Sequence, residues 1–107
     1  MNDTATRTAL RDCKRLVVKI GSSALCAEGG RFAQVAEQVA TQVKAGRKVV
    51  LVSSGAVALG RERLGLSERP KKISLLQAAA ATGQSLLMRA YEDAFEPLGI
   101  HVAQVLL

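Results

Sequence analysis

The sequence predicts an α/β fold with a mainly parallel sheet. Two apolar, β-branched runs at residues 15–20 and 48–53 have the composition of strands. Between them, residues 31–45 carry apolar side chains at steps of three and four, which is typical of an amphipathic helix. A strand, a helix and a second strand with short joints form a βαβ unit, whose crossover is right-handed. With 107 residues and 49% apolar side chains, the chain is at most one ordinary domain.

The first expected strand, residues 15–20, does not alternate cleanly between apolar and polar side chains. That pattern is typical of a parallel strand buried on both faces. Lys19 interrupts the run just before Gly21, and an ammonium at the mouth of a buried strand is costly to desolvate unless an anion meets it. The strand is followed by a small-residue loop at residues 21–30.

The expected helix at residues 31–45 ends at Gly46, where a helix C-terminal glycine belongs. Lys44, Arg47 and Lys48 lie where they complement the negative end of the helix dipole. The second strand, residues 48–53, follows at once.

After that strand we expect a short helix at residues 56–64, a polar connector at 65–72 and a long helix at 74–96. Gly83 lies inside the long helix, and close packing against another element is its simplest explanation. Pro97 and Gly99 end this helix, and residues 100–107 read as a third strand. A sheet that stops there has an open edge, so we expect further strands downstream and regard residues 15–107 as part of a larger domain. Residues 1–14 are polar and are expected to form a flexible tail.

Composition excludes several classes of function. The net charge of +6 suits polyanionic partners such as nucleotides, but the few aromatic side chains and the mixed charges at residues 61–72 argue against nucleic-acid binding by this segment. No apolar run approaches a membrane span, and residues 1–13 lack the apolar core of a signal peptide. Cys13 and Cys26 have neither redox nor zinc spacing, so reduced thiols in a cytoplasmic protein are expected.

Two turns at the carboxyl ends of the strands are the candidate site. Ligands of open α/β sheets bind there. The turns begin at Gly21-Ser22 and at Ser53-Ser54-Gly55-Ala56, and their backbone N–H groups are suited to phosphate oxygens, with Lys19 to neutralise charge. The alternative interpretation is that Gly21 and Gly55 only permit tight turns and that Lys19 reaches solvent.

Other chemistries find less support in the sequence. It contains neither a GxxxxGK[ST] motif nor a GxGxxG motif after the first strand. A hydrolase using Ser54 lacks the elbow motif around its serine, and the sole histidine, His101, fits a structural position in the third strand. We find no metal cluster in the sequence. A non-catalytic βαβ module that binds anions or nucleic acid remains an alternative.

Four segments in order resemble the amino acid kinase family. They are residues 17–23, VVKIGSS; 52–60, VSSGAVALG; 79–87, AAATGQSLL; and 100–107, IHVAQVLL. The first is similar to several kinases of the family, whereas the second and third are more specific. They are similar to members that phosphorylate the γ-carboxylate of L-glutamate at the entry to proline biosynthesis. The resemblance covers residues 15–107 and implies a three-layer αβα fold.

The resemblance also implies roles for individual residues. Lys19 matches the catalytic lysine that contacts the ATP phosphates, and Gly21 and Ser22 match the phosphate-side loop. Ser54 matches a glutamate-binding residue, with Gly55 and Ala56 lining the same pocket. The implied substrates are L-glutamate and Mg-ATP, and the implied assembly is a homo-oligomer.

The family's nucleotide lobe, further substrate-binding residues and a second catalytic lysine would lie beyond position 107. We therefore expect the 107 residues alone to be inactive. Another member of the same family, with a different acceptor, is the alternative within this resemblance.

Overall fold

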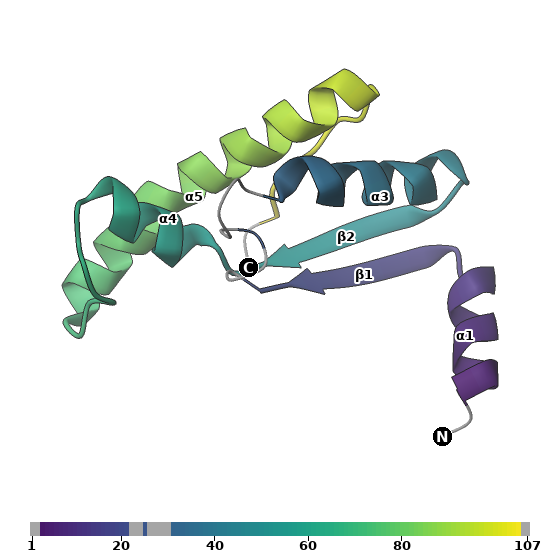
Figure 1. Ribbon diagram of the computed structural model, residues 1–107, viewed down its shortest axis with the longest axis horizontal. Coiled ribbons are helices and arrows are strands. Elements are labelled where there is room, and N and C mark those ends of the chain that lie inside the picture. Colours follow the sequence, from purple (N-terminus) through teal and green to yellow (C-terminus); the bar gives the residue numbers. More distant parts are fainter. Residues whose placement is uncertain (1–2, 22–24, 26–30, 106–107) are drawn as a thin grey trace.

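The computed structural model describes residues 3–21, 25 and 31–105. Its sheet has two parallel strands, β1 (Arg15–Ile20) and β2 (Lys48–Ser53), joined through α3 (Phe32–Lys44) (Figure 1). Both strands have the predicted bounds, and the predicted βαβ unit and α/β class are confirmed. The register pairs Arg15 with Lys48 at one end and Ile20 with Ser53 at the other, so the two strands begin and end together.

The turn from α3 into β2 has the predicted glycine stop. Gly46 adopts a φ of 93°, a left-handed conformation that favours glycine. Its N–H donates to the Val43 carbonyl, and the Arg47 N–H donates to the Gln42 carbonyl at 3.1 Å. This pair of bonds is the Schellman motif, which satisfies the last carbonyls of the helix and releases the chain directly into β2.

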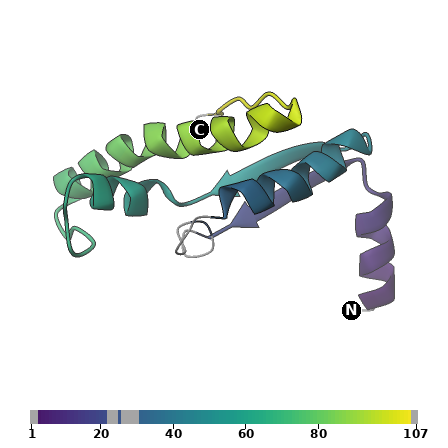
Figure 2. The same ribbon diagram turned by 45° about the horizontal axis from the view of Figure 1, so that its top comes forward.

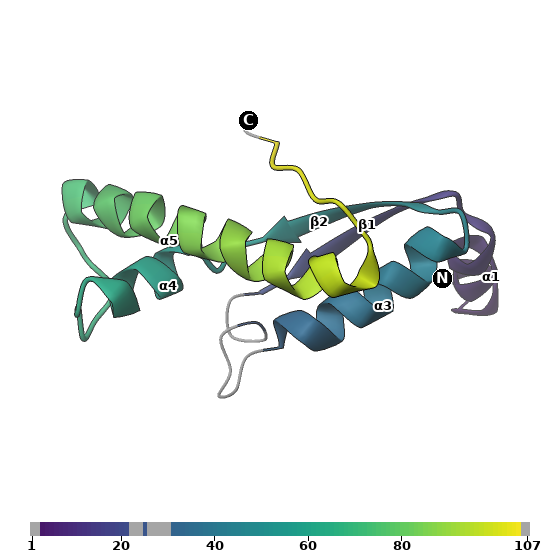
Figure 3. The ribbon, with the colours of Figure 1, turned by 90° about the horizontal axis from the view of Figure 1, so that it is seen from above.

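The core lies between the sheet and the two helices that cover one of its faces, α3 and α5 (Ile73–Phe95) (Figures 1 and 3). Aromatic side chains join these helices: the Phe32 and Tyr91 rings meet edge to face with centroids 5.1 Å apart. Tyr91 also stacks on Phe95, whose side chain is 1% exposed. The buried members of this core are Leu25, Ala36, Val39, Leu87, Tyr91 and Phe95.

Beyond the carboxyl ends of the strands, α5 continues and packs along a second helix, α4 (Ala56–Arg63) (Figure 2). The predicted helices at 56–64 and 74–96 are therefore confirmed to within a residue. α5 is followed by a 3-10 turn, η1 (Glu96–Leu98), which contains Pro97 and ends at Gly99. These two residues end the helix as predicted.

The opposite face of the sheet is open in the described part of the chain. Val17, Val50 and Val52 lie on it and are 72%, 58% and 45% exposed. The expectation that β1 is buried on both faces is wrong, because its Val17 is exposed. In both strands half-buried positions alternate with exposed ones along the whole length. The described residues thus provide the sheet and one helical layer.

The expected third strand is not formed at residues 100–105. The segment leaves the end of α5 at an angle to both strands (Figure 3). Residues 100–105 and β2 line the same open cavity of about 930 Å³. Because this cavity lies between the two segments, residues 100–105 do not form with β2 the backbone hydrogen bonds that define a strand.

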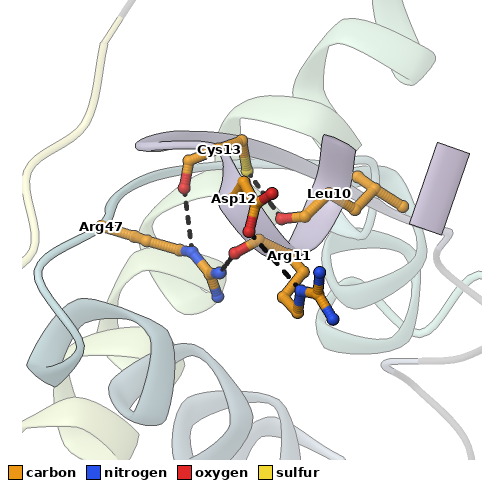
Figure 4. A network of polar contacts seen from close by, with 5 residues as sticks. All are labelled: Leu10, Arg11, Asp12, Cys13 and Arg47. Atoms are coloured by element: carbon orange, nitrogen blue, oxygen red, sulfur yellow. Dashed lines mark hydrogen bonds and ion pairs between the residues drawn. The ribbon is translucent and has the colours of Figure 1, made fainter. Parts of the chain in front are cut away.

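The N-terminal segment also differs from expectation, because residues within the expected tail form a helix, α1 (Asp3–Asp12), with no buried residue. Arg47 holds its end (Figure 4). The Arg47 guanidinium donates to the Cys13 carbonyl at 3.0 Å, to the Arg11 carbonyl and to the Gln42 side-chain oxygen. Arg47 therefore ties α1 to the C-terminal end of α3, a longer-range role than the helix-dipole partner that the sequence suggested.

Candidate functional site

The register of the sheet brings the two candidate turns together. Lys19 pairs with Val52 and Ile20 pairs with Ser53. Gly21 and Ser54 are the next residues along each strand, so both turns leave the sheet at the same edge (Figure 1). The predicted convergence of the two turns at the carboxyl edge is therefore present in the structure.

Lys19 lies on the open face of the sheet, beside Val52. Its side chain is exposed, so the expected cost of desolvating the ammonium is absent in this structure. No ion-pair partner for Lys19 is found within residues 3–21, 25 and 31–105. The charge at this edge is thus available to an anion that approaches the ends of the strands.

The second turn runs directly into the N-terminus of α4. Ser54 is exposed, while Gly55 is buried and is the N-cap residue of the helix. The first helical bond joins the Leu59 N–H to the Gly55 carbonyl at 3.1 Å. The N–H groups before Leu59 have no partner within the helix, and they carry the positive end of the helix dipole. This turn can therefore donate backbone hydrogen bonds to an anionic ligand.

Ser53 and Ser54 point in different directions although they are neighbours. Ser53 belongs to the half-buried positions of β2, and its hydroxyl oxygen is buried without a hydrogen-bond partner among the described residues. Ser54, by contrast, is exposed at the turn. Of the two serines, the exposed Ser54 is therefore the one whose hydroxyl is accessible to a ligand, and its role in substrate binding stays a prediction.

The first turn is described only as far as Gly21. This glycine is exposed, and a Cβ added to it would meet no atom of the described residues within 4 Å. In the second turn, Gly55 has a φ of −78°, which any residue adopts. Tight-turn geometry therefore does not require glycine at Gly55. Ser22, predicted to contact phosphate, lies outside the described residues.

The sequence interpretation missed Gly60. Gly60 in α4 and Gly83 in α5 are both buried, and they meet where the two helices cross. The close packing expected at Gly83 is confirmed. A signal was available in the sequence, because Ala56 and Gly60, like Ala79 and Gly83, are small residues four positions apart and so share one helix face.

Two further polar residues, His101 and Gln84, line the cavity that also contacts Val52 and Ser53 at the end of β2. His101 is exposed in the segment that follows α5. Within the described ranges, no three His, Cys, Asp or Glu side chains gather where they could hold a metal ion. In the same part of the chain, no helix combines the length and apolar character needed to cross a bilayer.

Comparisons with known proteins identify the family to which the sequence belongs. The profile of the amino acid kinase family matches residues 14–107. The chain is 57% identical over 98 residues to a glutamate 5-kinase of Thermus thermophilus, an alignment that covers 88% of this chain and 26% of that protein. It is 53% identical over 103 residues to the Geobacter sulfurreducens glutamate 5-kinase, covering 92% and 28%.

A third relative, the glutamate 5-kinase of Moorella thermoacetica, is 47% identical over 112 positions, covering all of this chain and 30% of that protein. The chain therefore spans between a quarter and a third of the length of these curated relatives. Because the family profile covers nearly all of its residues, the chain belongs to the amino acid kinase family.

Proposed function

We propose that this chain forms the acceptor-side part of a glutamate 5-kinase, which transfers the γ-phosphoryl group of ATP to the γ-carboxylate of L-glutamate. The observation that carries the proposal is the register of the sheet. It places Lys19 and the Ser54-Gly55-Ala56 turn at one edge, where a phosphoryl donor and a carboxylate acceptor have to meet. The names of the relatives supply the identity of the acceptor.

In this proposal the second turn holds glutamate. The exposed Ser54 hydroxyl and the free N–H groups at the start of α4 are donors, and a carboxylate is an acceptor. Hydrogen bonds to an ionised acceptor are shorter and stronger than neutral ones. An anionic amino acid therefore suits this turn better than a neutral one.

Lys19 serves the phosphoryl group as the catalytic residue. A γ-carboxylate oxygen of glutamate attacks the γ-phosphorus, the bond from that phosphorus to the β,γ-bridging oxygen breaks, and ADP leaves with the electron pair. The products are γ-glutamyl phosphate and ADP. Catalysis of such a transfer consists mainly of positioning and charge stabilisation, and the exposed ammonium of Lys19 provides charge at the required edge. Gly21 and Ser22 are proposed to contribute to the ATP phosphate loop.

ATP is expected to arrive with Mg²⁺, which neutralises phosphate charge when bound. The described residues offer no cluster of metal ligands, so they do not fit a protein-bound metal ion. We therefore assign no step to the metal in this segment. The homo-oligomer, the cytoplasmic location and the place in proline biosynthesis belong to the same proposal and are implied by the family resemblance.

A chimera tests the proposal. Residues 14–107 of this chain replace the matching segment of the Thermus thermophilus glutamate 5-kinase, which supplies the rest of a kinase. We expect the chimera to form acyl phosphate from ATP and L-glutamate, trapped with hydroxylamine as the hydroxamate. Preference for aspartate or N-acetylglutamate would instead assign the segment to another acceptor within the family.

Two controls accompany this assay. The parent Thermus enzyme shows that the assay detects the product, and the 107-residue chain alone is expected to consume no ATP. A soluble, folded chimera without hydroxamate formation on any of the three acceptors would contradict the proposal. Glutamate-dependent ATP consumption by the 107 residues alone would contradict the expectation that they are insufficient.

A further inference from the structure

We infer that Gly60 and Gly83 are positioning residues for the acceptor turn, Ser54-Gly55-Ala56. The close approach of α4 and α5 that these glycines allow determines where the turn lies relative to Lys19. The inference rests on the proposed function, because it assumes that the turn holds the acceptor. It adds two residues that contact neither substrate.

The helices meet backbone to backbone at this crossing. A Cβ on residue 60 would lie 1.6 Å from the Ala79 carbonyl oxygen and 2.9 Å from the Gly83 nitrogen. A Cβ on residue 83 would lie 1.6 Å from the Ala56 carbonyl oxygen and 2.6 Å from the Gly60 nitrogen. Since all four are backbone atoms, no change of side-chain rotamer can relieve the clash. The helices themselves must separate.

The contact is reciprocal, and one side of it belongs to the acceptor turn. Ala56 is both the first residue of α4 and the last residue of the turn, and its carbonyl faces Gly83. Gly60 is the only buried residue of α4, while Ala56 and Leu59 are partly buried against the hydrophobic core. A displacement of α4 therefore acts directly on residues 54–56.

The other end of the turn is fixed. Ser53 is paired with Ile20 in the sheet, one residue beyond Lys19. If α5 pushes α4 away, Ser53 stays with the sheet, and the change in geometry falls on the residues between Ser53 and α4. Lys19 remains in place because it lies on the other strand. The acceptor side should therefore respond without a change on the phosphate side.

The size of the effect follows from the distances. Close contacts between carbon and a carbonyl oxygen are about 3.3 Å, so a Cβ placed at 1.6 Å requires a separation of more than about 1 Å. A misplacement of about 1 Å in an active site can cost about 10²-fold in rate. We expect Gly83→Ala to lower kcat/KM for glutamate at least about 10-fold in the chimera, with a higher KM for glutamate as part of that loss.

The experiment separates positioning from simple loss of stability. KM and kcat are measured for glutamate and ATP in the wild-type chimera and in Gly83→Ala, with the folded fraction of each protein taken from circular dichroism. Partial unfolding lowers the apparent kcat but leaves both KM values unchanged, because unfolded molecules do not bind substrate. Positioning through α4 instead raises KM for glutamate and leaves KM for ATP within about twofold.

Two further variants complete the design. Ala81→Val adds bulk at an exposed position of the same helix and is expected to leave both KM values unchanged. Ala79→Ser adds one atom to the fully buried neighbour of Gly60, and it keeps the test available if Gly83→Ala does not accumulate as soluble protein. A smaller increase in KM for glutamate alone is expected for Ala79→Ser.

An unchanged KM for glutamate in Gly83→Ala, or in Ala79→Ser where that variant is the soluble one, would overturn the inference. Because both are compared with an active wild-type chimera, that result would leave the proposed function intact. An inactive wild-type chimera would count against the proposed function itself.

Discussion

The ends of the two strands, Gly21 after β1 and Ser54-Gly55-Ala56 after β2, differ in how closely the described residues pack around them. At Gly21, the residue after β1, an added Cβ would meet no atom of residues 3–21, 25 and 31–105 within 4 Å. At the end of β2 the turn leads into α4, where Gly60 and Gly83 bring two backbones into direct contact. Gly21 on the proposed phosphate side is therefore expected to accept a Cβ, whereas the acceptor side is set by helix packing. Specificity for the acceptor is expected to reside on the tightly packed side.

Lys19→Ala should have the largest effect on kcat, and it tests whether the lysine at the end of β1 takes part in catalysis. Removing one group that stabilises transition-state charge typically costs about 10²–10³-fold in kcat. We expect a loss of this size in the chimera, with little change in thermal unfolding because Lys19 is exposed. Lys19→Met is the matched control for loss of charge with the stem retained, and it should be equally inactive. A variant within about threefold of wild type would remove Lys19 from the mechanism.

Gly60→Ala tests the packed side through stability. Overpacking a tight contact costs about 1–3 kcal/mol in free energy of unfolding. Alanine would otherwise favour a helix by about 1 kcal/mol over glycine, so the sign of the change distinguishes a clash from an ordinary helical position. We expect a lower melting temperature for Gly60→Ala. A higher melting temperature would show that the helices do not approach as closely as described.

Arg47→Ala extends the comparison to the opposite edge of the sheet. Its guanidinium bonds to carbonyls of Arg11 and Cys13, and hydrogen bonds from charged groups contribute about 1.5–3 kcal/mol each at most. We expect faster amide hydrogen exchange in α1 and unchanged substrate KM values, because the contacts lie at the amino ends of the strands. Equal protection of residues 3–12 in both proteins would show that Arg47 does not hold α1.

Gly21→Ala should have the smallest effect on stability. Its φ is not left-handed, and no atom of the described part of the chain lies within 4 Å of an added Cβ, so we expect the position to accept alanine without strain. Replacing glycine at such a position restricts the unfolded chain and stabilises by about 0.4–1 kcal/mol. If Gly21→Ala lowered the free energy of unfolding as much as Gly60→Ala does, the two positions would not differ in packing as inferred. Chemical denaturation of both variants in the same chimera measures the difference.

Local patterns in the sequence were enough to predict most of the elements. The β-branched runs gave both strands with their bounds, and Gly46 marked the end of α3 through its left-handed conformation. The candidate turns were also predicted to meet, because parallel strands place their carboxyl ends at one edge. For the strands and the helix end, the determining interactions lie within a few residues of the chain, whereas the meeting of the turns follows from the general geometry of a βαβ unit.

Longer-range features were not predictable in the same way. Val17 and Val50 looked suited to burial, but whether a strand face is covered depends on other layers. Residues 100–105 have the composition of a strand, yet a strand also needs a partner at hydrogen-bonding distance. The long-range bonds of Arg47 and the contact of Gly60 with α5 likewise depend on tertiary packing.

The open valine face has a consequence for the behaviour of the 107-residue chain in solution. Val17, Val50 and Val52 favour association between copies, while the net charge of +6 keeps copies apart. Salt weakens the second effect and not the first, since the Debye length falls from about 30 Å at 0.01 M to about 8 Å at 0.15 M ionic strength. The colloidal stability of the chain should therefore decrease as salt is added, and light scattering across that range would measure it.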